Sequence, residues 1–331
     1  MPTPDPTPLG PPPRPTDKLT GVIVTYKSRK TISAALASAK RCADDDALNR
    51  AGMGFHLVVV DNATPPPDNT RDILAREATF AQVILGNANI GFGRGCNVGL
   101  RATTTPYIVF FNPDAQLEPN AVRTIIEFMD AHPKCAIAGP AIVHGGEGSD
   151  HEHQHIQHVG ALATPMDMVG DAMGLYRSMK KRQPVQVGAQ PFRTEWVSGA
   201  MLVGRTKVLQ DLDGFDPRFF LYWEETDLCR RALNAGHEIW AIPQAVVHHI
   251  GGVSAAEESD DRVKGCIAEH YYKSRHYYFR KHFGFIPAAL ADVGEALFMP
   301  LHETFRKIRG KKTNPIFKRW KHPMLKMPND V

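Results

Sequence analysis

Short apolar runs alternate with helical patterns over the first 140 residues, and this alternation limits the fold more than any other feature of the chain. The first run, residues 20–26 (Thr-Gly-Val-Ile-Val-Thr-Tyr), is rich in β-branched residues, as expected of a strand buried on both faces. Four further runs follow it: His56–Val60, Gln82–Leu85, Tyr107–Phe111 and Cys135–Ala138. Helical patterns separate them, one running to about Arg50 and the others over 69–80, 92–103 and 119–131. Repeated βα units of this length predict an α/β fold, with a doubly wound, mostly parallel sheet flanked by helices.

Polar side chains stand at the ends of three of these strands: Thr25-Tyr26, Asp61-Asn62 and Asn112-Pro113-Asp114. Such sheets bind ligands at the carboxyl ends of their strands, where the strand order reverses, so we expect these residues to line one crevice. Asp114 can hold a divalent cation through its oxygens while a diphosphate supplies further ligands. A turn that starts the next helix is the alternative, because Asn, Pro and Asp all favour turns.

The glycine-rich segment Gly91–Asn97 resembles a dinucleotide-binding turn but lacks its spacing. The third glycine of Gly-x-Gly-x-x-Gly would fall on Cys96, and the first βα turn, Lys27-Ser28-Arg29, has no glycine. What remains is a glycine-rich helix start with Arg94 beside it, able to approach a phosphate. A purely structural tight turn is equally compatible with these glycines.

Three carboxylates, Glu224, Glu225 and Asp227, follow directly on a segment with five aromatic residues. Buried carboxylates are costly unless they are paired or bind a metal, and apolar surroundings shift their pKa values toward proton chemistry. His248-His249 follows after an apolar run and precedes a Gly-Gly turn, so a strand would deliver His249 into a pocket as a metal ligand. A hydrogen-bonded core histidine is the alternative. The histidines within 144–158 have irregular spacing in a polar stretch and indicate a solvated loop.

Composition sets the limits on domain number and compartment. With 331 residues, 43% of them hydrophobic, the chain can fold into one large domain with an appendage. The proline-rich residues 1–18 lack an apolar core and indicate a flexible, disordered leader and no signal peptide. The five cysteines are scattered without zinc or disulfide spacing, which favours the reducing cytoplasm.

The C-terminal part is strongly basic. From Arg262 to Lys321 there are 14 Lys/Arg against 4 Asp/Glu, a local charge of +10, which predicts an anionic partner surface unless this is an ordinary solvated helix. Tyr271–Lys281 mixes aromatic and basic side chains, a pattern that suits a membrane interface, with packing against the rest of the protein as the alternative. No nucleic-acid motif accompanies it. The apolar stretch Phe283–Leu301 is interrupted by prolines and acids, so it can lie on a bilayer but cannot span one.

Taken in order, these segments resemble the family 2 glycosyltransferases, in particular their bacterial rhamnosyltransferase-like branch. The resemblance covers roughly residues 20–285. The pieces that carry it are Val22–Tyr26, Val59–Asn62, Asn87–Phe92 with Asn97 and Gly99, Asn112–Asp114, Ser198–Ala200, Gly214–Arg231 and His249–Ser254. It implies a GT-A fold, a nucleotide-diphosphate sugar donor, a divalent metal (Mg²⁺ or Mn²⁺) and inversion at the anomeric carbon. We therefore expect a catalytic domain over 19–260, divided into a nucleotide-binding half (19–140) and an acceptor and catalytic half (141–260), followed by a helical basic extension over 261–331.

The resemblance also implies roles for individual residues. The family's Glu-Asp pair corresponds to Glu224-Glu225, which makes Glu225 the expected general base, with Glu224 and Asp227 as supporting acids. Asp114 and His249 are the expected metal ligands. The residues expected to bind the donor are Thr25, Tyr26, Asp61, Asn62, Asn89, Gly91, Arg94, Asn97, Asn112 and Asp114, with Asp61 hydrogen-bonded to a pyrimidine. The residues expected to border the sugar or acceptor are Trp196, Ser198, Gly199, Ala200, Tyr222 and Trp223.

The expected activity is the metal-dependent transfer of a sugar, rhamnose from dTDP-rhamnose, to a glycan or lipid-linked glycan in cell-surface polysaccharide synthesis. UDP-galactofuranose or another UDP-hexose is the alternative donor. A non-catalytic nucleotide-sugar-binding scaffold, or an adaptor at the membrane, is the alternative from another class. We expect a cytoplasmic protein, peripheral on the inner face of the cytoplasmic membrane, that does not bind nucleic acid; oligomers are compatible with the sequence.

Overall fold

The computed structural model of the chain describes residues 8–144, 157–175, 181–249 and 261–308. Four parallel strands form the first half of its main sheet in the order β3-β2-β1-β4. They are β1 (Asp17–Thr25), β2 (Gly54–Asp61), β3 (Gln82–Leu85) and β4 (Tyr107–Phe111). The helices that connect them are α1 (Ile32–Asp44), α2 (Asp46–Arg50), α3 (Thr70–Glu77) and α4 (Phe92–Ala102). The predicted βα alternation is confirmed; β1, β2 and β4 are almost entirely buried, whereas β3 lies at the edge of the sheet and is partly exposed.

The second half of the sheet continues from β4 through one reversed strand. β10 (Met201–Arg205) is antiparallel to both β4 and β6 (Cys135–His144), and β11 (Glu238–His249) is parallel to β6. Two short strands, β5 (Ala115–Gln116) and β9 (Phe192–Thr194), pair with β11 in the antiparallel sense. Because β2 and β4 flank β1 on opposite sides, the strand order reverses beside β1. The carboxyl ends of β1 and β4 therefore lie at the switch point, where the sequence predicts a ligand crevice.

Both faces of the sheet are apolar because side chains alternate along each strand. In β1, Leu19 and Ile23 join the cluster that α1 and α5 (Pro119–Ala131) cover, whereas Val22 and Val24 join the cluster on the other face. α4 covers this second face at close range: a Cβ added at Gly95 or Gly99 would lie 2.6 or 2.3 Å from side-chain atoms of β1. These two glycines therefore allow close packing of α4 on the sheet. For Gly95, this agrees with the structural role that the sequence left open beside phosphate binding.

The remaining elements flank the acceptor half of the expected catalytic domain. α8 (Thr206–Asp211) and α9 (Glu224–Asn234) lie on the α4 face, and β7 (His158–Gly160) pairs with β8 (Arg182–Pro184). α6 (Pro165–Ala172) is a helix that the sequence did not predict in this irregular region. Residues 8–18, expected to belong to a disordered leader, instead lie against the sheet, since Leu9 bridges Val83 and β1 begins at Asp17.

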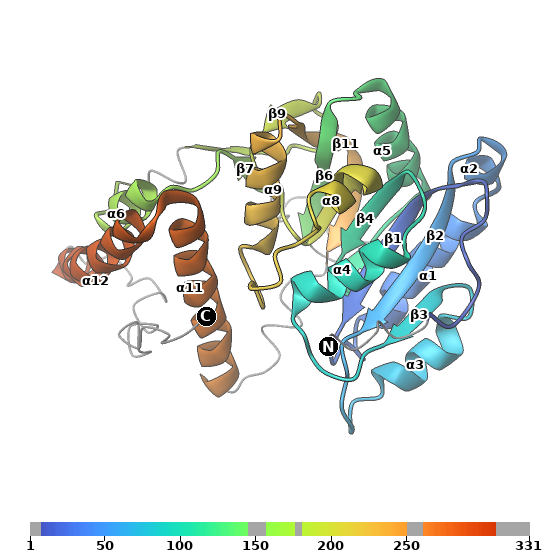
Figure 1. The fold of residues 1–331 in the computed structure, drawn as a ribbon, viewed down its shortest axis with the longest axis horizontal. Helices are drawn as coiled ribbons and strands as arrows, with labels where there is room; N and C mark the ends of the chain where they lie inside the picture. The colour runs from blue at the N-terminus through green and yellow to red at the C-terminus, as the bar shows by residue number, and fades with distance from the viewer. Residues whose placement is uncertain (1–7, 145–156, 176–180, 250–260, 309–331) are drawn as a thin grey trace.

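Two long helices end the described part of the chain: α11 (Asp261–Phe283) and α12 (Phe285–Ile308). The described part of the C-terminal extension, residues 261–308, is therefore helical, as expected. α11 packs beside α9, and α12 lies with α6 at the end of the molecule opposite α2 and α3 (Figure 1). Among the described residues, no helix has the length and apolar character needed to cross a membrane. The four cysteines whose side chains are described, Cys42, Cys96, Cys135 and Cys229, are buried free thiols.

Candidate active site

The carboxyl ends of β1 and β2 are joined by the backbone, where the Asn62 amide donates to the Thr25 carbonyl at 2.8 Å. Thr25 is fully buried, and its Oγ1 has no hydrogen-bond partner within the described residues. Tyr26, one residue farther along, is 38% exposed. At the end of β1, the expected binding site for the donor nucleotide therefore has one buried hydroxyl, that of Thr25, and one accessible ring, that of Tyr26.

Asp61 is buried and already paired. Its carboxylate accepts a hydrogen bond from Arg71 Nε at 2.6 Å and from the Thr64 amide at 3.2 Å, and Arg71 also donates to the Gly86 carbonyl at 2.8 Å. A carboxylate has about four lone-pair sites, so a pyrimidine would use those that these bonds leave. The sequence did not predict this role of Arg71. The one indication in the sequence is a basic residue in the helix that follows β2.

Asn62 and Asn89 hold the loop that follows β3. The Asn62 side chain donates to Asn89 Oδ1 at 2.9 Å and to the Gly91 carbonyl at 3.1 Å, and it accepts from the Ile90 amide at 3.1 Å. Gly91 has a φ of 87°, and a Cβ there would lie 2.4 Å from the Phe220 carbonyl oxygen. The two asparagines therefore shape the wall of the expected donor pocket through the backbone that they position.

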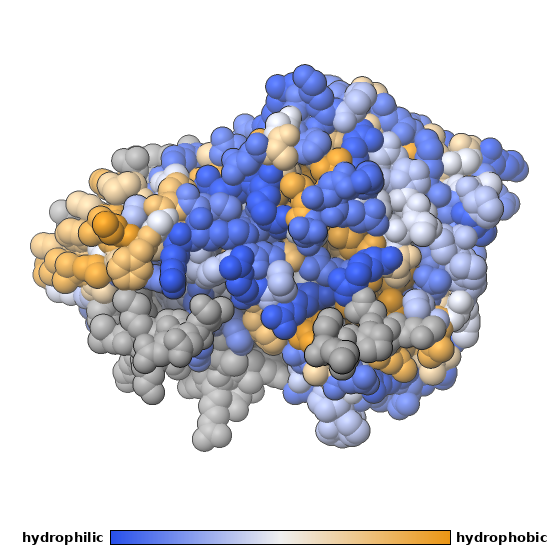
Figure 2. Space-filling model, in the orientation of Figure 1, coloured by the Kyte–Doolittle hydropathy of each residue, from blue (hydrophilic) through white to orange (hydrophobic). Residues whose placement is uncertain are grey.

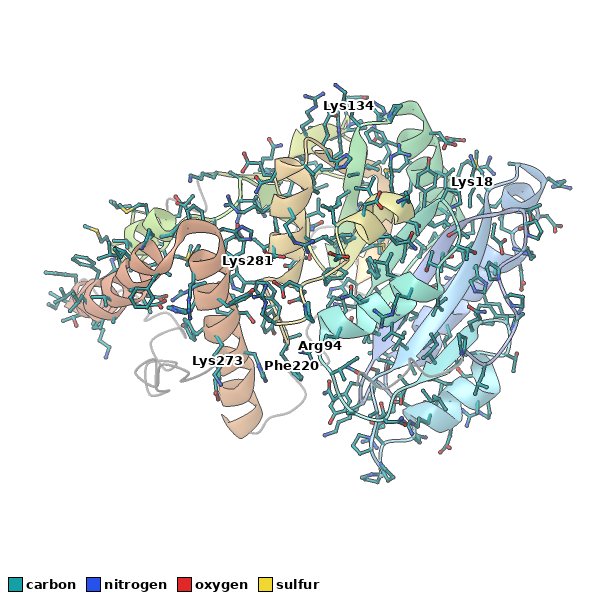
Figure 3. All side chains as sticks on the ribbon, viewed as in Figure 1. Lys18, Arg94, Lys134, Phe220, Lys273 and Lys281 are labelled. Carbon is teal, nitrogen blue, oxygen red and sulfur yellow. The ribbon has the colours of Figure 1, made fainter. Side chains whose placement is uncertain are left out.

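Arg94 and Asn97, both expected to bind the donor, instead hold the loop before α9. Arg94 Nε donates to the Pro217 carbonyl at 2.6 Å, beside Phe220 (Figure 3). The Asn97 amide donates to the Phe215 carbonyl at 2.7 Å and accepts from the Phe215 amide at 2.8 Å. Their hydrogen bonds go to backbone groups of this loop, so both residues anchor the loop, and donor binding by them stays a prediction.

Asp114 and His249 lie together. β5, which starts directly after Asp114, pairs with the end of β11 so that His249 is opposite Ala115. Asp114 Oδ1 and His249 Nε2 are 3.1 Å apart, and both residues are buried. This separation fits two ligands at right angles on one small cation, since bonds of about 2.1 Å place such ligands about 3 Å apart.

The pair supplies two ligands and would need more from the donor. Among the described residues, no group of three or more His, Cys, Asp and Glu side chains could hold a metal ion. The expected site therefore depends on diphosphate oxygens for the rest of the coordination. Of the segment expected to follow His249, residues 250–254 lie outside the described residues.

The segment Ser198-Gly199-Ala200 connects this pair to the carboxylates. The Asn112 amide donates to the Ala200 carbonyl at 3.1 Å, because Ala200 directly precedes β10 and Asn112 directly follows β4. Ser198 Oγ accepts from the Ala200 amide at 3.2 Å. A Cβ added at Gly199 would lie 3.6 Å from the Glu225 carboxyl carbon. Two residues after Asn112 comes Asp114, so the expected metal ligand and the expected base flank one short segment.

Glu224 and Glu225 begin α9, directly after a strained turn. Tyr222 and Trp223 both have a φ of 69°, a left-handed conformation that non-glycine residues rarely adopt. Glu224 is 4% exposed and Glu225 is half-buried. The helix N-terminus favours negative charge by a modest amount, about 0.3–1 kcal/mol at exposed sites, and here burial outweighs it.

Burial raises the pKa of both glutamates. Burial, and then repulsion from Glu225, raise the pKa of Glu224 well above its ordinary value. For Glu225, burial raises the pKa to about 6, against a lowering effect of the local backbone amides and the Trp196 side chain. Burial therefore favours the protonated form of Glu224, whereas Glu225, with a pKa of about 6, is mostly ionised at neutral pH and can accept a proton.

Asp227 has a different environment from the two glutamates. Although burial raises its pKa, the hydrogen bond from His282 and the charges of Arg231 and Lys281 hold that pKa below its usual range. The contacts are 2.7 Å to His282, 2.7 Å to Arg231 and 2.6 Å to Lys281. A carboxylate with three cationic or polar partners is a poor proton acceptor. Asp227 therefore fits an anchor for α11 and not the catalytic role expected of it.

Trp223, expected to face sugar or acceptor, is 8% exposed and packs against α11. Its ring contacts Tyr278 and Phe279, with centroids 5.1 and 5.5 Å away. Tyr222 is half-buried and has an edge-on contact with Tyr271 at 5.9 Å. Tyr222 and Trp223 thus contact α11, and Trp223 in particular belongs to the core.

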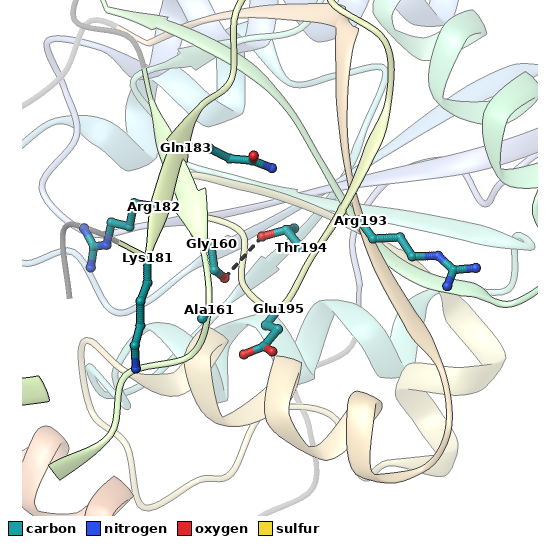
Figure 4. Close-up of a pocket in the computed structure, with 8 residues that line it drawn as sticks. All are labelled: Gly160, Ala161, Lys181, Arg182, Gln183, Arg193, Thr194 and Glu195. Carbon is teal, nitrogen blue, oxygen red and sulfur yellow. Dashed lines mark hydrogen bonds between the residues drawn. The ribbon is translucent and has the colours of Figure 1, made fainter. Parts of the chain in front are cut away.

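Trp196 keeps a partly accessible face. The Arg182 guanidinium lies 5.6 Å from its ring centre, and Trp196 bridges Gly160. A shallow pocket next to it is lined by Gly160, Ala161, Lys181, Arg182, Gln183, Arg193, Thr194 and Glu195 (Figure 4). Its cationic side chains point away from one another, and Lys181 is paired with Asp167 at 2.8 Å. We therefore place the candidate active site between Asp114 and Glu225, and not in this pocket.

Comparison with known protein families gives one match over most of the sheet. Residues 20–212 match the sequence profile described as Glycosyl transferase family 2. The chain is 24% identical over 253 residues to the N-acetylglucosaminyl-diphospho-decaprenol L-rhamnosyltransferase of Mycobacterium tuberculosis, an alignment that covers 71% of this chain and 76% of that protein. It is 24% identical over 297 residues to the dTDP-rhamnosyl transferase RfbF of Shigella flexneri, covering 86% of each.

Solved structures are similar in fold. The mannosyltransferase PcManGT from Pyrobaculum calidifontis, determined in complex with GDP-Man and Mn²⁺, superposes with a TM-score of 0.54 at 13% identity, covering 95% of this chain and 81% of that one. Residues 1–349 of TarS from S. aureus give a TM-score of 0.50 at 16% identity, covering 92% and 77%. These neighbours are GT-A glycosyltransferases, and the expected GT-A fold is confirmed.

Proposed function

Because this chain belongs to glycosyl transferase family 2, and is therefore a glycosyltransferase, we propose that it transfers rhamnose from dTDP-rhamnose to a lipid-linked glycan, with inversion at the anomeric carbon. One observation carries the proposal: the Asp114–His249 pair and the Glu225 carboxylate flank the segment Ser198–Ala200. The activities for which the rhamnosyltransferase relatives are named support the sugar and the type of acceptor.

Glu225 acts as the general base. Its carboxylate takes the proton from an acceptor hydroxyl, and that oxygen attacks the anomeric carbon from the face opposite the diphosphate. Such help is typically worth about 10²–10⁴ in rate, so positioning of donor and acceptor supplies much of the remainder. Burial favours the protonated form of Glu224 beside Glu225, and this form limits the negative charge close to the approaching hydroxyl.

Asp114 and His249 would hold Mg²⁺ or Mn²⁺. When bound, the cation neutralises charge that develops on the diphosphate leaving group. Asn112, with its amide fixed to Ala200, keeps Asp114 at the end of β4. In this proposal the donor binds the nucleotide half, 19–140, where Thr25, Tyr26 and the remaining lone pairs of Asp61 receive the thymine. The acceptor binds the 141–260 half, where the Trp196 ring offers a flat face to a sugar.

A donor panel tests the proposal. We expect dTDP-rhamnose with Mn²⁺ to raise the melting temperature and to be turned over, and UDP-galactofuranose and other UDP-hexoses to do so less. Asp114→Asn should remove the Mn²⁺-dependent part of the shift while its melting temperature without ligand stays close to that of the wild type. Preferential turnover of UDP-galactofuranose would show that this nucleotide sugar, and not dTDP-rhamnose, is the donor. Binding of nucleotide sugars without turnover of any, across acceptors, would favour the non-catalytic scaffold.

The lipid-linked acceptor also implies a place in the cell. We propose that the enzyme works at the cytoplasmic face of the membrane, in contact with anionic lipid, and that it takes part in making cell-surface polysaccharide. The basic C-terminal part of the chain, with its local charge of +10, supports this location.

A further inference from the structure

Helix α12 carries an exposed apolar stripe along its whole length. Seven large apolar side chains, each between 54% and 75% exposed, recur every three or four residues and so share one face of the helix: Ile286, Leu290, Val293, Leu297, Leu301, Phe305 and Ile308. Scattered apolar residues on a surface are normal, but a continuous row of this length is unusual for a protein surrounded by water.

Two acidic residues of α12 face the other way. Asp292 and Glu295 lie 3.0 and 2.5 Å from Arg275 of α11, whose side chain is 2% exposed, and Asp292 also pairs with His276 at 2.5 Å. Ala288 and Ala291 are fully buried in the same interface, against Tyr278 and Phe279. The ion pairs and the small residues fix which face of α12 meets the protein, and the apolar face is left outside.

α6 extends this surface. The two helices are in close contact, since a Cβ at Gly294 of α12 would lie 2.8 Å from Val169, and a Cβ at Gly174 would lie 2.3 Å from His302. The exposed side chains Met166, Met173 and Leu175 follow on from the stripe. Figure 2 shows apolar residues gathered at the end of the molecule where α12 and α6 lie. We call these exposed side chains of α12 and α6 the apolar face.

The aromatic and basic segment Tyr271–Lys281 of α11, which the sequence favours for membrane contact, lies largely inside the protein. Tyr278 and Phe279 are fully buried, and Lys281 is paired with Asp216 and Asp227. Its aromatics pack against the loop before α9, the alternative reading of this segment. A membrane surface on the C-terminal part must therefore be sought on α12.

Charge decides between a bilayer and a second copy of the chain as the partner. The stretch from Arg262 to Lys321 has a local charge of +10, and exposed Lys307 lies at the end of the stripe. A second copy would bring an equal positive charge against it, whereas an anionic bilayer attracts it. The sequence that follows α12, residues 309–321, adds six Lys/Arg and no Asp/Glu. Basic residues that accompany an apolar helix face are typical of helices that lie in the membrane interface.

We propose that the apolar face of α12 and α6 docks on an anionic lipid bilayer, with its side chains entering the headgroup region. Only the choice of lipid as partner rests on the proposed function, because a lipid-linked acceptor must be reached at the membrane. The docking itself requires neither donor nor acceptor.

Co-flotation of the full-length protein with lipid vesicles tests the proposal. We expect binding to phosphatidylcholine vesicles that contain about 30% phosphatidylglycerol, and weaker binding to phosphatidylcholine alone, because the charges act together with the apolar face. The double variant Leu290→Gln/Leu297→Gln should bind about tenfold more weakly or less. Val187→Gln is the matched control, since Val187 is 58% exposed but lies between β8 and β9.

Light scattering and thermal melting of the same variants complete the test. The double variant should keep the mass in solution, the melting temperature and the hydrolysis of soluble donor of the wild type. Absence of wild-type binding, or equal losses in Val187→Gln and the double variant, would overturn the proposal. So would a fall in mass or in melting temperature of the double variant with its vesicle binding unchanged, because the apolar face would then be covered by protein. Inactivity toward every donor would contradict the proposed function and leave this result untouched.

Discussion

Two adjacent glutamates in the first turn of α9 have raised pKa values, and burial is the main cause for each. Glu224 is almost completely buried, and its pKa is raised well above the ordinary value of about 4.3. The folded protein therefore binds a proton at Glu224 that the unfolded chain has released. Stability must fall as pH rises from about 4.3 toward the raised pKa, since unfolding then releases protons.

Glu224→Gln should remove this loss of stability at high pH, because glutamine resembles the protonated acid in shape and in charge. We expect the variant to melt above the wild type at pH 8, by about 2 °C or more, and the difference to shrink toward pH 4.5. Melting curves between pH 4.5 and 8 measure it. A variant that is less stable than the wild type by the same amount at every pH would mean that Glu224 is ionised and paired.

Residue types and their order predicted much of the candidate site, but not the partners of each side chain. The sequence predicted that Asp114 and His249 would meet at a strand end, and the structure places them 3.1 Å apart. It could not show that Asp227 meets His282, which comes 55 residues later, or that Asn97 clamps Phe215. Polar residues that hold a loop and those that bind a ligand have the same composition, and only their neighbours distinguish them.

At the scale of elements, α11 fixes the position of α9 and so of the glutamates. Lys281 is the centre of this contact, 2.8 Å from Asp216 and 2.6 Å from Asp227, both of them buried (Figure 3). The favourable charge of Lys281 offsets the burial of two carboxylates. Loss of the Lys281 ammonium leaves each of the two carboxylates with one ion-pair partner fewer, although Arg218 still pairs with Asp216 and Arg231 with Asp227.

We expect Lys281→Met to lower the free energy of unfolding by about 2 kcal/mol, less than for a fully buried pair because Lys281 is partly exposed. Lys273→Met is the control on the same helix: its ion pair with Glu269 is exposed on both sides, and its loss should cost less than about 0.5 kcal/mol. Denaturant unfolding of the two variants measures both values. Equal effects would show that α11 is not held on α9 through Lys281.

The elements themselves were predictable where their periodicity was strong. The strands β1 to β4 and helices α1, α3, α4 and α5 lie close to the predicted ranges, because buried β-branched runs and helical spacing leave few other conformations. α6 was missed although it carries a start signal, a capping box between Thr164 and Asp167 with Pro165 at its first position. Only eight residues long, it has too little periodicity to stand out from the irregular segment around it.

At the scale of the whole molecule, the sheet brings together segments that are far apart in the chain. The end of β4, the start of β10, the start of α9 and the end of β11 contribute Asp114, Gly199, Glu225 and His249. α11 lies beside α9, and α12 leads from it to α6 at one end of the molecule (Figure 1), where the apolar side chains of α12 are exposed. We propose that the enzyme docks on the membrane and that its active site has the metal ligands on one side of the segment Ser198–Ala200 and the general base on the other.

The transfer rate of Glu225→Gln is the most direct test of this account. With saturating dTDP-rhamnose, Mn²⁺ and acceptor, kcat should fall by about 10² or more, while donor affinity stays within about twofold of the wild type. The wild-type rate should also fall as pH drops through about 6, because the protonated Glu225 carboxyl cannot accept a proton. A Glu225→Gln enzyme that binds donor and transfers sugar at the wild-type rate would contradict the account, since the reaction would then need no base at this position.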